Sequence, residues 1–191
     1  MRARQGCWRW AERVVAALAR LVWRRDALAE ARLVVVQRHH APRRPRAAIG
    51  GAVAVAVGPG VALDAISDAE AQTSGEIRLH VESRCKADVL DRAAAVFATL
   101  GMHKTELRNG VLFYLATTDR QFAILGDGGI NAAVPEKFWD GVKDTVIAGL
   151  ADGKAGAGLA AGIRLAGEQL SAHFLVAEDD VNELSDDISF G

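Results

Sequence analysis

The chain has 191 residues, of which 50% are hydrophobic, 25% charged and 6% aromatic, with a formal net charge of -1. This length suits one ordinary domain with a hydrophobic core, and the composition excludes a wholly disordered or collagen-like chain. The two cysteines, Cys7 and Cys85, exclude a disulfide framework and a cysteine zinc cage, which fits a reducing or thiol-indifferent location, and we expect a cytoplasmic one.

The near-zero net charge is the sum of two oppositely charged segments. Residues 1–50 hold twelve arginines, no lysine and three acidic residues, which gives +9, and the remainder holds 11 basic and 21 acidic residues, which gives -10. A basic segment is attracted to anionic surfaces, either lipid or nucleic acid. Nucleic acid is the weaker alternative, because its phosphates would repel the acidic remainder.

The basic segment begins with a predicted helix. No glycine or proline interrupts Trp8–Gln37, apolar residues recur there at helical spacing, and arginines occupy the other side. Tryptophan and arginine on one amphipathic helix are typical of a membrane interface. Two interpretations stay open. The segment is either a helix that attaches the protein to a membrane surface or membrane protein, or a disordered extension, including one that results from a start codon assigned too early.

A linker and a short apolar run follow this helix. The stretch His39–Arg46 is rich in arginine and proline, which is typical of a linker. The run Ala47–Leu63 is uncharged, but it is short for a membrane span and holds four glycines and a proline. We therefore assign residues 1–60 to an arginine-rich extension with an Ala/Gly-rich linker, and residues 61–191 to a folded domain.

The domain begins with a helix, a strand and a second helix. The segment Leu63–Thr73 has the apolar spacing of a short helix, and Glu76–Glu82 alternates polar and apolar residues as a strand does. Asp88, with Asp91 three residues later, signals the start of a helix that continues to Leu100. The strand has an aliphatic core face and an ionisable opposite face, formed by Ile77, Leu79 and Val81 and by Arg78, His80 and Glu82, respectively.

A hairpin and two further helices complete the predicted domain. The continuously apolar Val111–Ala116 is expected to be a strand covered on both faces, and Gln121–Leu125 returns beside it after a turn. Helices are expected from Pro135 to Leu150 and from Ala157 to His173. The strand–helix–strand unit makes the first two strands parallel, so the sheet is mixed. We therefore predict an α/β fold, an α/β/α sandwich with a small mixed sheet.

Several motifs in combination resemble one family. They are Thr73-Ser-Gly-Glu-Ile-Arg, Asn109-Gly110 before an apolar strand, Asp119-Arg120 in a turn, and Gly126-Asp-Gly-Gly-Ile after the next strand. With them, Glu70–Asp187 resembles the TPM domain family, which includes the thylakoid acid phosphatase and photosystem repair proteins, and is most similar to its short, soluble bacterial branch. The resemblance implies an α/β/α sandwich that binds divalent cations such as calcium. It implies phosphatase activity only for some members.

Polar residues are expected to gather at one end of the sheet. If the first two strands are parallel, Glu76 and Asn109 lie at the same end, and the hairpin returns Asp127 to that end. Carboxylate and amide oxygens suit a hard cation, so we predict a calcium or magnesium site there. The alternative is that Glu76 and Asp127 are ordinary turn and helix-cap residues, as is common for Asp beside Gly.

Asp119 is a metal candidate at the opposite end of the sheet. Open α/β sheets bind ligands at the carboxyl ends of parallel strands, which favours this end. A hairpin turn residue is the simpler interpretation of Asp119. The two arguments disagree, so the choice of end stays open among four candidate metal ligands, Glu76, Asn109, Asp127 and Asp119.

The other candidates carry weaker signals. His80 and His103 could act as ligands or acid–base groups, Cys85 lacks a partner in sequence, and the acidic run Glu178–Asp187 is either a ligand source or a solvated tail. No nucleophile or phosphate-loop motif is present, so catalytic residues stay unassigned. We expect no small-molecule cofactor, because Gly126–Ile130 lacks the spacing of a dinucleotide loop and no helix is expected directly after it.

These arguments lead to one expected function and one alternative. We expect a divalent-cation-binding domain that serves as an interaction or membrane-associated accessory module. The alternative is a metal-dependent, acid phosphatase-like hydrolase, in which the cation polarises a phosphoryl oxygen.

Overall fold

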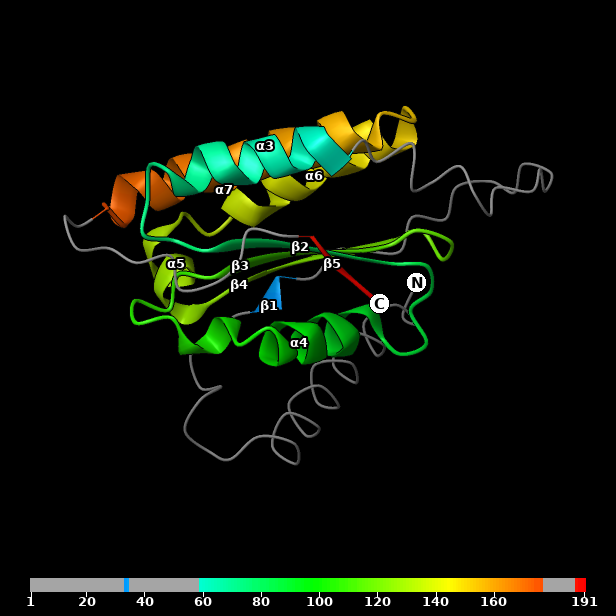
Figure 1. The fold of residues 1–191 in the computed structure, drawn as a ribbon, viewed down its shortest axis with the longest axis horizontal. Coiled ribbons are helices and arrows are strands. Elements are labelled where there is room, and N and C mark those ends of the chain that lie inside the picture. The colour runs from blue at the N-terminus through cyan, green and yellow to red at the C-terminus, as the bar shows by residue number, and fades with distance from the viewer. Residues whose placement is uncertain (1–32, 35–58, 177–187) are drawn as a thin grey trace, which may run out of the picture. The chain divides into compact units, whose positions relative to one another are not determined.

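The computed structural model describes residues 33–34, 59–176 and 188–191, all within the unit Arg32–Gly191. Figure 1 shows three layers in this unit, with a sheet in the middle. One face of the sheet is covered by α3 (Pro59–Glu70), α6 (Phe138–Ala151) and α7 (Ala155–His173), and the other by α4 (Val89–Thr99). The predicted α/β/α sandwich is therefore confirmed.

The sheet has five strands among the described residues, in the order β1-β4-β3-β2-β5. Strands β2 (Ile77–Glu82) and β3 (Val111–Ala116) are parallel, with Ile77 opposite Val111. Strand β4 (Gln121–Gly126) runs antiparallel to β3 and completes the hairpin. The mixed sheet follows the sequence pattern, and all six residues of β3 are buried, as expected of a strand covered on both faces.

Two short strands lie at the edges of the sheet. Strand β1 (Leu33–Val34) pairs antiparallel with β4, and β5 (Ser189–Phe190) pairs parallel with β2. The helical interpretation of Trp8–Gln37 is wrong at Leu33 and Val34, where aliphatic residues complete the β4 edge instead. Residues 1–32, 35–58 and 177–187, which include the rest of that predicted helix, the linker and the acidic run, lie outside the described residues.

A short helix, α5 (Gly128–Ala133), follows β4 directly, so the expectation that no helix begins there is wrong. Asp127 begins it, because its side chain accepts a hydrogen bond from the Gly128 N–H. Two glycines in the first turn concealed this helix in the sequence, since glycine is a poor helix former. The helix expected from Pro135 begins later, at Phe138, and a single 3-10 turn, η1 (Met102–Lys104), follows α4.

Glycines allow α6 and α7 to pack with their backbones in contact. A Cβ atom added to Gly158 would lie 2.8 Å from the Cα atom of Gly149. This close approach explains why a helix as long as α7 tolerates glycine at such positions.

The predicted membrane attachment concerns residues that the structure does not describe. In the described part of the chain, no helix has both the length and the apolar character required to cross a bilayer. Attachment through residues 1–50 therefore stays a prediction.

Candidate functional site

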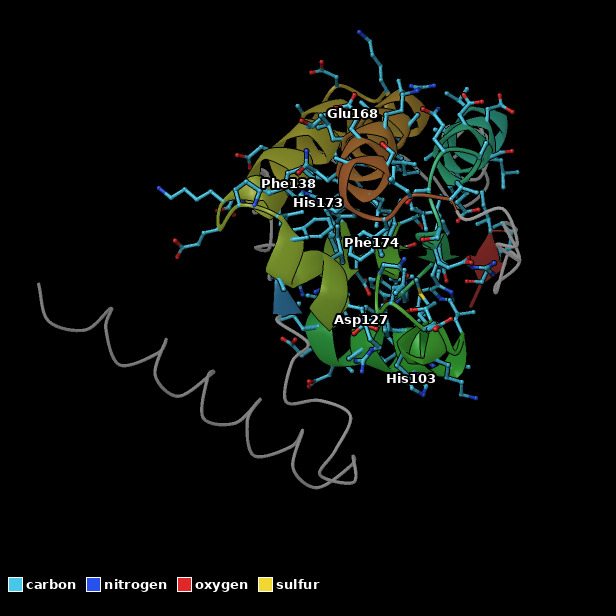
Figure 2. The ribbon with its side chains drawn as sticks, turned by 90° about the vertical axis from the view of Figure 1, so that its left-hand side faces the viewer. His103, Asp127, Phe138, Glu168, His173 and Phe174 are labelled. Atoms are coloured by element: carbon cyan, nitrogen blue, oxygen red, sulfur yellow. The ribbon has the colours of Figure 1, made fainter. Side chains whose placement is uncertain are left out.

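The candidate metal ligands from sequence meet at what we call the Asp127 end, formed by Glu76, Arg108, Asn109 and Asp127. The Val111 N–H donates to the Glu76 carbonyl at 2.7 Å, and the Asp127 N–H donates to the Gly110 carbonyl at 2.9 Å. These bonds place the starts of β2 and β3 beside the end of β4. Figure 2 looks at this end of the sheet, with Asp127 and His103 toward the α4 side and His173 and Phe174 toward the three-helix side.

The buried carboxylate of Asp127 accepts hydrogen bonds from Arg108 and from the backbone of Gly128. The residue is 1% exposed, and Arg108 donates from Nε to Oδ2 and from Nη2 to Oδ1, both at 2.7 Å. The Gly128 N–H also donates to Oδ1 at 2.7 Å. A two-point guanidinium–carboxylate contact is among the strongest ionic hydrogen bonds in proteins. Asp127 therefore serves as a helix cap and as the anion of an ion pair, as the simpler sequence interpretation allowed.

Arg108 was missed in the sequence analysis. It lies directly before Asn109-Gly110, with a left-handed φ of 54°, and its carbonyl accepts a hydrogen bond from the Gly129 N–H at 2.8 Å. A Cβ atom at Gly129 would lie 2.1 Å from the Leu107 carbonyl oxygen, so only glycine allows this approach. The sequence could have predicted this contact, because Arg108 precedes β3, Asp127 follows β4, and a hairpin brings these two positions together.

Asn109 carries a buried oxygen without a hydrogen-bond partner in the described ranges. Its Nδ2 donates to the Ser74 carbonyl at 3.0 Å, whereas its Oδ1 accepts no hydrogen bond there, and the residue is 1% exposed. The Ser74 hydroxyl is also buried without such a bond, and Glu76 is 5% exposed. A buried polar oxygen left unsatisfied costs free energy, so this position suits a bound cation or an ordered water.

Asp119 lies at the opposite end of the sheet, in the turn between β3 and β4. Its Oδ2 accepts a hydrogen bond from the Cys85 N–H at 2.8 Å in an exposed position. This bond fastens the connector after β2 to the hairpin turn. The structure therefore brings Glu76, Asn109 and Asp127 to one end and leaves Asp119 at the other.

A second polar group, the Glu82 cluster, consists of the buried His80, Glu82 and Tyr114 and the partly exposed Arg92. Arg92 donates to Glu82 from Nε at 3.0 Å and from Nη2 at 2.8 Å, and the Tyr114 hydroxyl donates to Glu82 Oε1. The His80 ring stacks on Tyr114, with centroids 5.8 Å apart and planes 8° apart, and its Nδ1 lies 2.8 Å from the Ser189 Oγ. The sequence placed His80 and Glu82 on one strand face but could not show their partners from α4, β3 and β5.

The environment of the Glu82 cluster fixes its protonation states. The hydrogen bonds from Arg92 lower the pKa of Glu82, so this carboxylate is ionised near neutral pH. Burial lowers the pKa of His80 against the opposing effect of Glu82, so its imidazole is neutral. Burial is also the largest cause that raises the pKa of Tyr114, which keeps its hydroxyl proton.

Comparison with known proteins identifies the class. The family model of the TPM domain matches residues 62–169, and the chain belongs to this family. The chain is also similar to the NMR structure of the BA42 protein from the psychrophilic bacterium Bizionia argentinensis. The two are 44% identical with a TM-score of 0.65, over 70% of this chain and 92% of that one. No curated protein matches the chain.

Proposed function

We propose that this TPM domain binds a divalent cation, calcium or magnesium, at the Asp127 end. The observation that carries the proposal is the buried Oδ1 of Asn109, which accepts no hydrogen bond from the described residues. Two buried carboxylates, Glu76 and Asp127, lie at the same end of the sheet. Oxygen donors of this kind are the ligands that Ca²⁺ and Mg²⁺ prefer.

The available ligands are oxygen atoms, as such a cation prefers, but the cation would have to replace Arg108 beside Asp127. The described ranges contain no group of three or more His, Cys, Asp or Glu side chains arranged to hold a metal, so Asn109 would act beside the two carboxylates. Arg108 now neutralises Asp127, and a cation would take over that role. Since the Arg108 side chain is 31% exposed, it can turn toward water when the cation binds.

Calorimetric titration with Ca²⁺ and with Mg²⁺ tests the site. We expect saturable heats for the wild-type chain and none for the double variant Glu76→Gln, Asp127→Asn, because both carboxylates are removed without a large change in shape. Asp119→Asn is the matched control, since it neutralises a candidate at the opposite end. Equal heats for the double variant and the wild type would exclude the Asp127 end.

Replacing Arg108 tests the exchange between guanidinium and cation. Arg108→Gln leaves the buried Asp127 without its ion-pair partner, which is expected to cost about 3–5 kcal/mol. Saturating Ca²⁺ should restore most of the lost free energy of unfolding, measured in urea. The exposed control Arg164→Gln should be as stable as the wild type and should be stabilised by Ca²⁺ no more than the wild type is. A loss that Ca²⁺ does not restore would contradict the exchange.

We propose an interaction or membrane-associated accessory role for this cation-binding domain. Its basic segment, residues 1–50, carries a net charge of +9, which favours anionic membranes. The full chain should sediment with vesicles that contain phosphatidylserine, at low salt and not with neutral vesicles. The hydrolase alternative predicts instead that the chain turns over a generic phosphate ester and that EDTA stops this reaction. Turnover that EDTA leaves unchanged would exclude the metal mechanism.

A further inference from the structure

Arg78 is a buried cation without an anion among the described residues. It lies in β2 and is only 7% exposed, and its Nε and Nη1 are buried without a hydrogen-bond partner there. A guanidinium cannot lose its proton in a protein, so burial cannot neutralise it. Placing such a charge out of water is costly unless an anion or another acceptor meets it. Arg92 and Arg108 differ, because their side chains are partly exposed and each contacts a carboxylate.

Arg78 lies in β2 next to the residues that pair with β5. The described residues of β5 pair with β2 at His80 and Val81, and Arg78 precedes both positions on β2. His80 follows Arg78 on the same strand face, roughly 6.6 Å along the strand. The Nε2 of His80 is buried without a hydrogen-bond partner in the described ranges, and it lies 3.9 Å from the Glu82 Oε2. Two buried nitrogen-bearing side chains with unused hydrogen-bonding capacity therefore lie next to each other.

We propose that Arg78 binds a small carboxylate monoanion at the edge of β2, with His80 beside it. The acidic residues of the same strand decide the charge of the ligand. Glu76 lies two residues before Arg78 and Glu82 four residues after it, so both share its face of the strand. Both are buried. A phosphate dianion would meet repulsion from both carboxylates, whereas a planar monoanion matches the guanidinium and adds a single charge. Glu76 is also a candidate ligand of the cation proposed at the Asp127 end, so the test is made without that cation.

Thermal unfolding in acetate tests the proposal. The full chain is melted in EDTA at constant ionic strength, with sodium chloride replaced stepwise by sodium acetate. We expect the wild-type midpoint to rise with acetate, because a ligand that binds only the native state stabilises it. Arg78→Gln should weaken the response about tenfold or more, as expected when a charged hydrogen bond is lost. The exposed control Arg164→Gln should respond as the wild type does. An unchanged midpoint in the wild type, or an equal response in Arg78→Gln, would overturn the proposal.

Two further measurements remove the remaining alternatives. Inorganic phosphate, mainly a dianion at about pH 8, should stabilise less than acetate, and a larger effect of phosphate would refute the monoanion assignment. If Arg78→Gln does not fold, nitrogen-15 NMR of the wild type replaces it. Acetate should then shift the Arg78 Nε–H and His80 ring resonances saturably, and saturable shifts confined to other residues would refute the site. Because EDTA is present throughout, failure here says nothing about the cation site.

Discussion

Strand β2 carries aliphatic side chains on one face and ionisable side chains on the other, and both faces are buried. Ile77 and Leu79 are 0% exposed within the core beside α3, α6 and α7. On the α4 side, Arg78, His80 and Glu82 are 5–7% exposed. Burial of the aliphatic face is favourable in itself, whereas burial of the ionisable face is favourable only where each charge meets a partner. The first face therefore stabilises the fold, and the contribution of the second depends on its charge partners and on its protonation states.

Within β2, the largest expected effect comes from the aliphatic face. Leu79→Ala removes a fully buried side chain and should lower the free energy of unfolding by about 2–5 kcal/mol, the usual cost of such a cavity. Urea unfolding measures the loss. Val81→Ala, on the same face but only partly buried, is the control and should cost less. A loss below that of Val81→Ala would contradict the assignment of Leu79 to the core.

A smaller loss is expected from the ionisable face. Glu82→Gln keeps the shape of the side chain but removes the charge that Arg92 and Tyr114 contact, and should cost about 1–3 kcal/mol. The side chain of Arg92 is 38% exposed, so it can recover water contacts and limit the loss. The exposed control Glu168→Gln should change stability little. If Glu82→Gln cost as much as Leu79→Ala, the proposed contrast between the two faces would fail.

The difference between the faces also marks the limit of what sequence could predict. The alternation in Glu76–Glu82 predicted a strand and both of its faces correctly, because side-chain direction alternates in every strand. It could not predict that the ionisable face is buried, since that depends on Arg92 from α4 and Ser189 from β5. Similarly, the strand order brought Asp127 near Asn109, but the contact between Arg108 and Asp127 depends on a backbone with positive φ.

Acidification should weaken the ionisable face in a defined pH range. Burial lowers the pKa of His80 below its ordinary value of 6.5, so the unfolded chain takes up this proton first as the pH falls. Stability is therefore full above pH 6.5 and decreases below it, by at most about 1.4 kcal/mol per pH unit for one group. Glu82, with a lowered pKa, contributes its own loss only below its ordinary value of 4.5.

Unfolding midpoints between pH 7.5 and pH 5 measure this loss. Arg78 lies on the same strand face as His80, and the groups that His80 meets are Glu82, Arg92 and Tyr114. The pKa of Glu82 is lowered and those of Arg92 and Tyr114 are raised, so none of these three changes charge in that range. His80→Gln should flatten the pH dependence, whereas His173→Gln, at an exposed position, should leave it unchanged. An unchanged slope in His80→Gln would remove His80 as the cause.

The smallest effect is expected at the turn that carries Asp119, and it separates the two ends of the sheet. Asp119→Asn alters one exposed hydrogen bond, to the Cys85 N–H, and should cost less than about 1 kcal/mol in urea unfolding. Its heats of cation binding should equal those of the wild type, because its carboxylate lies far along β3 from Asn109. If the heats fell instead, the cation would bind at the carboxyl ends of β2 and β3, where open α/β sheets usually bind ligands. The ion pair between Arg108 and Asp127 would then have a structural role only. Like the aliphatic face of β2, it would stabilise the fold and would not bind a ligand.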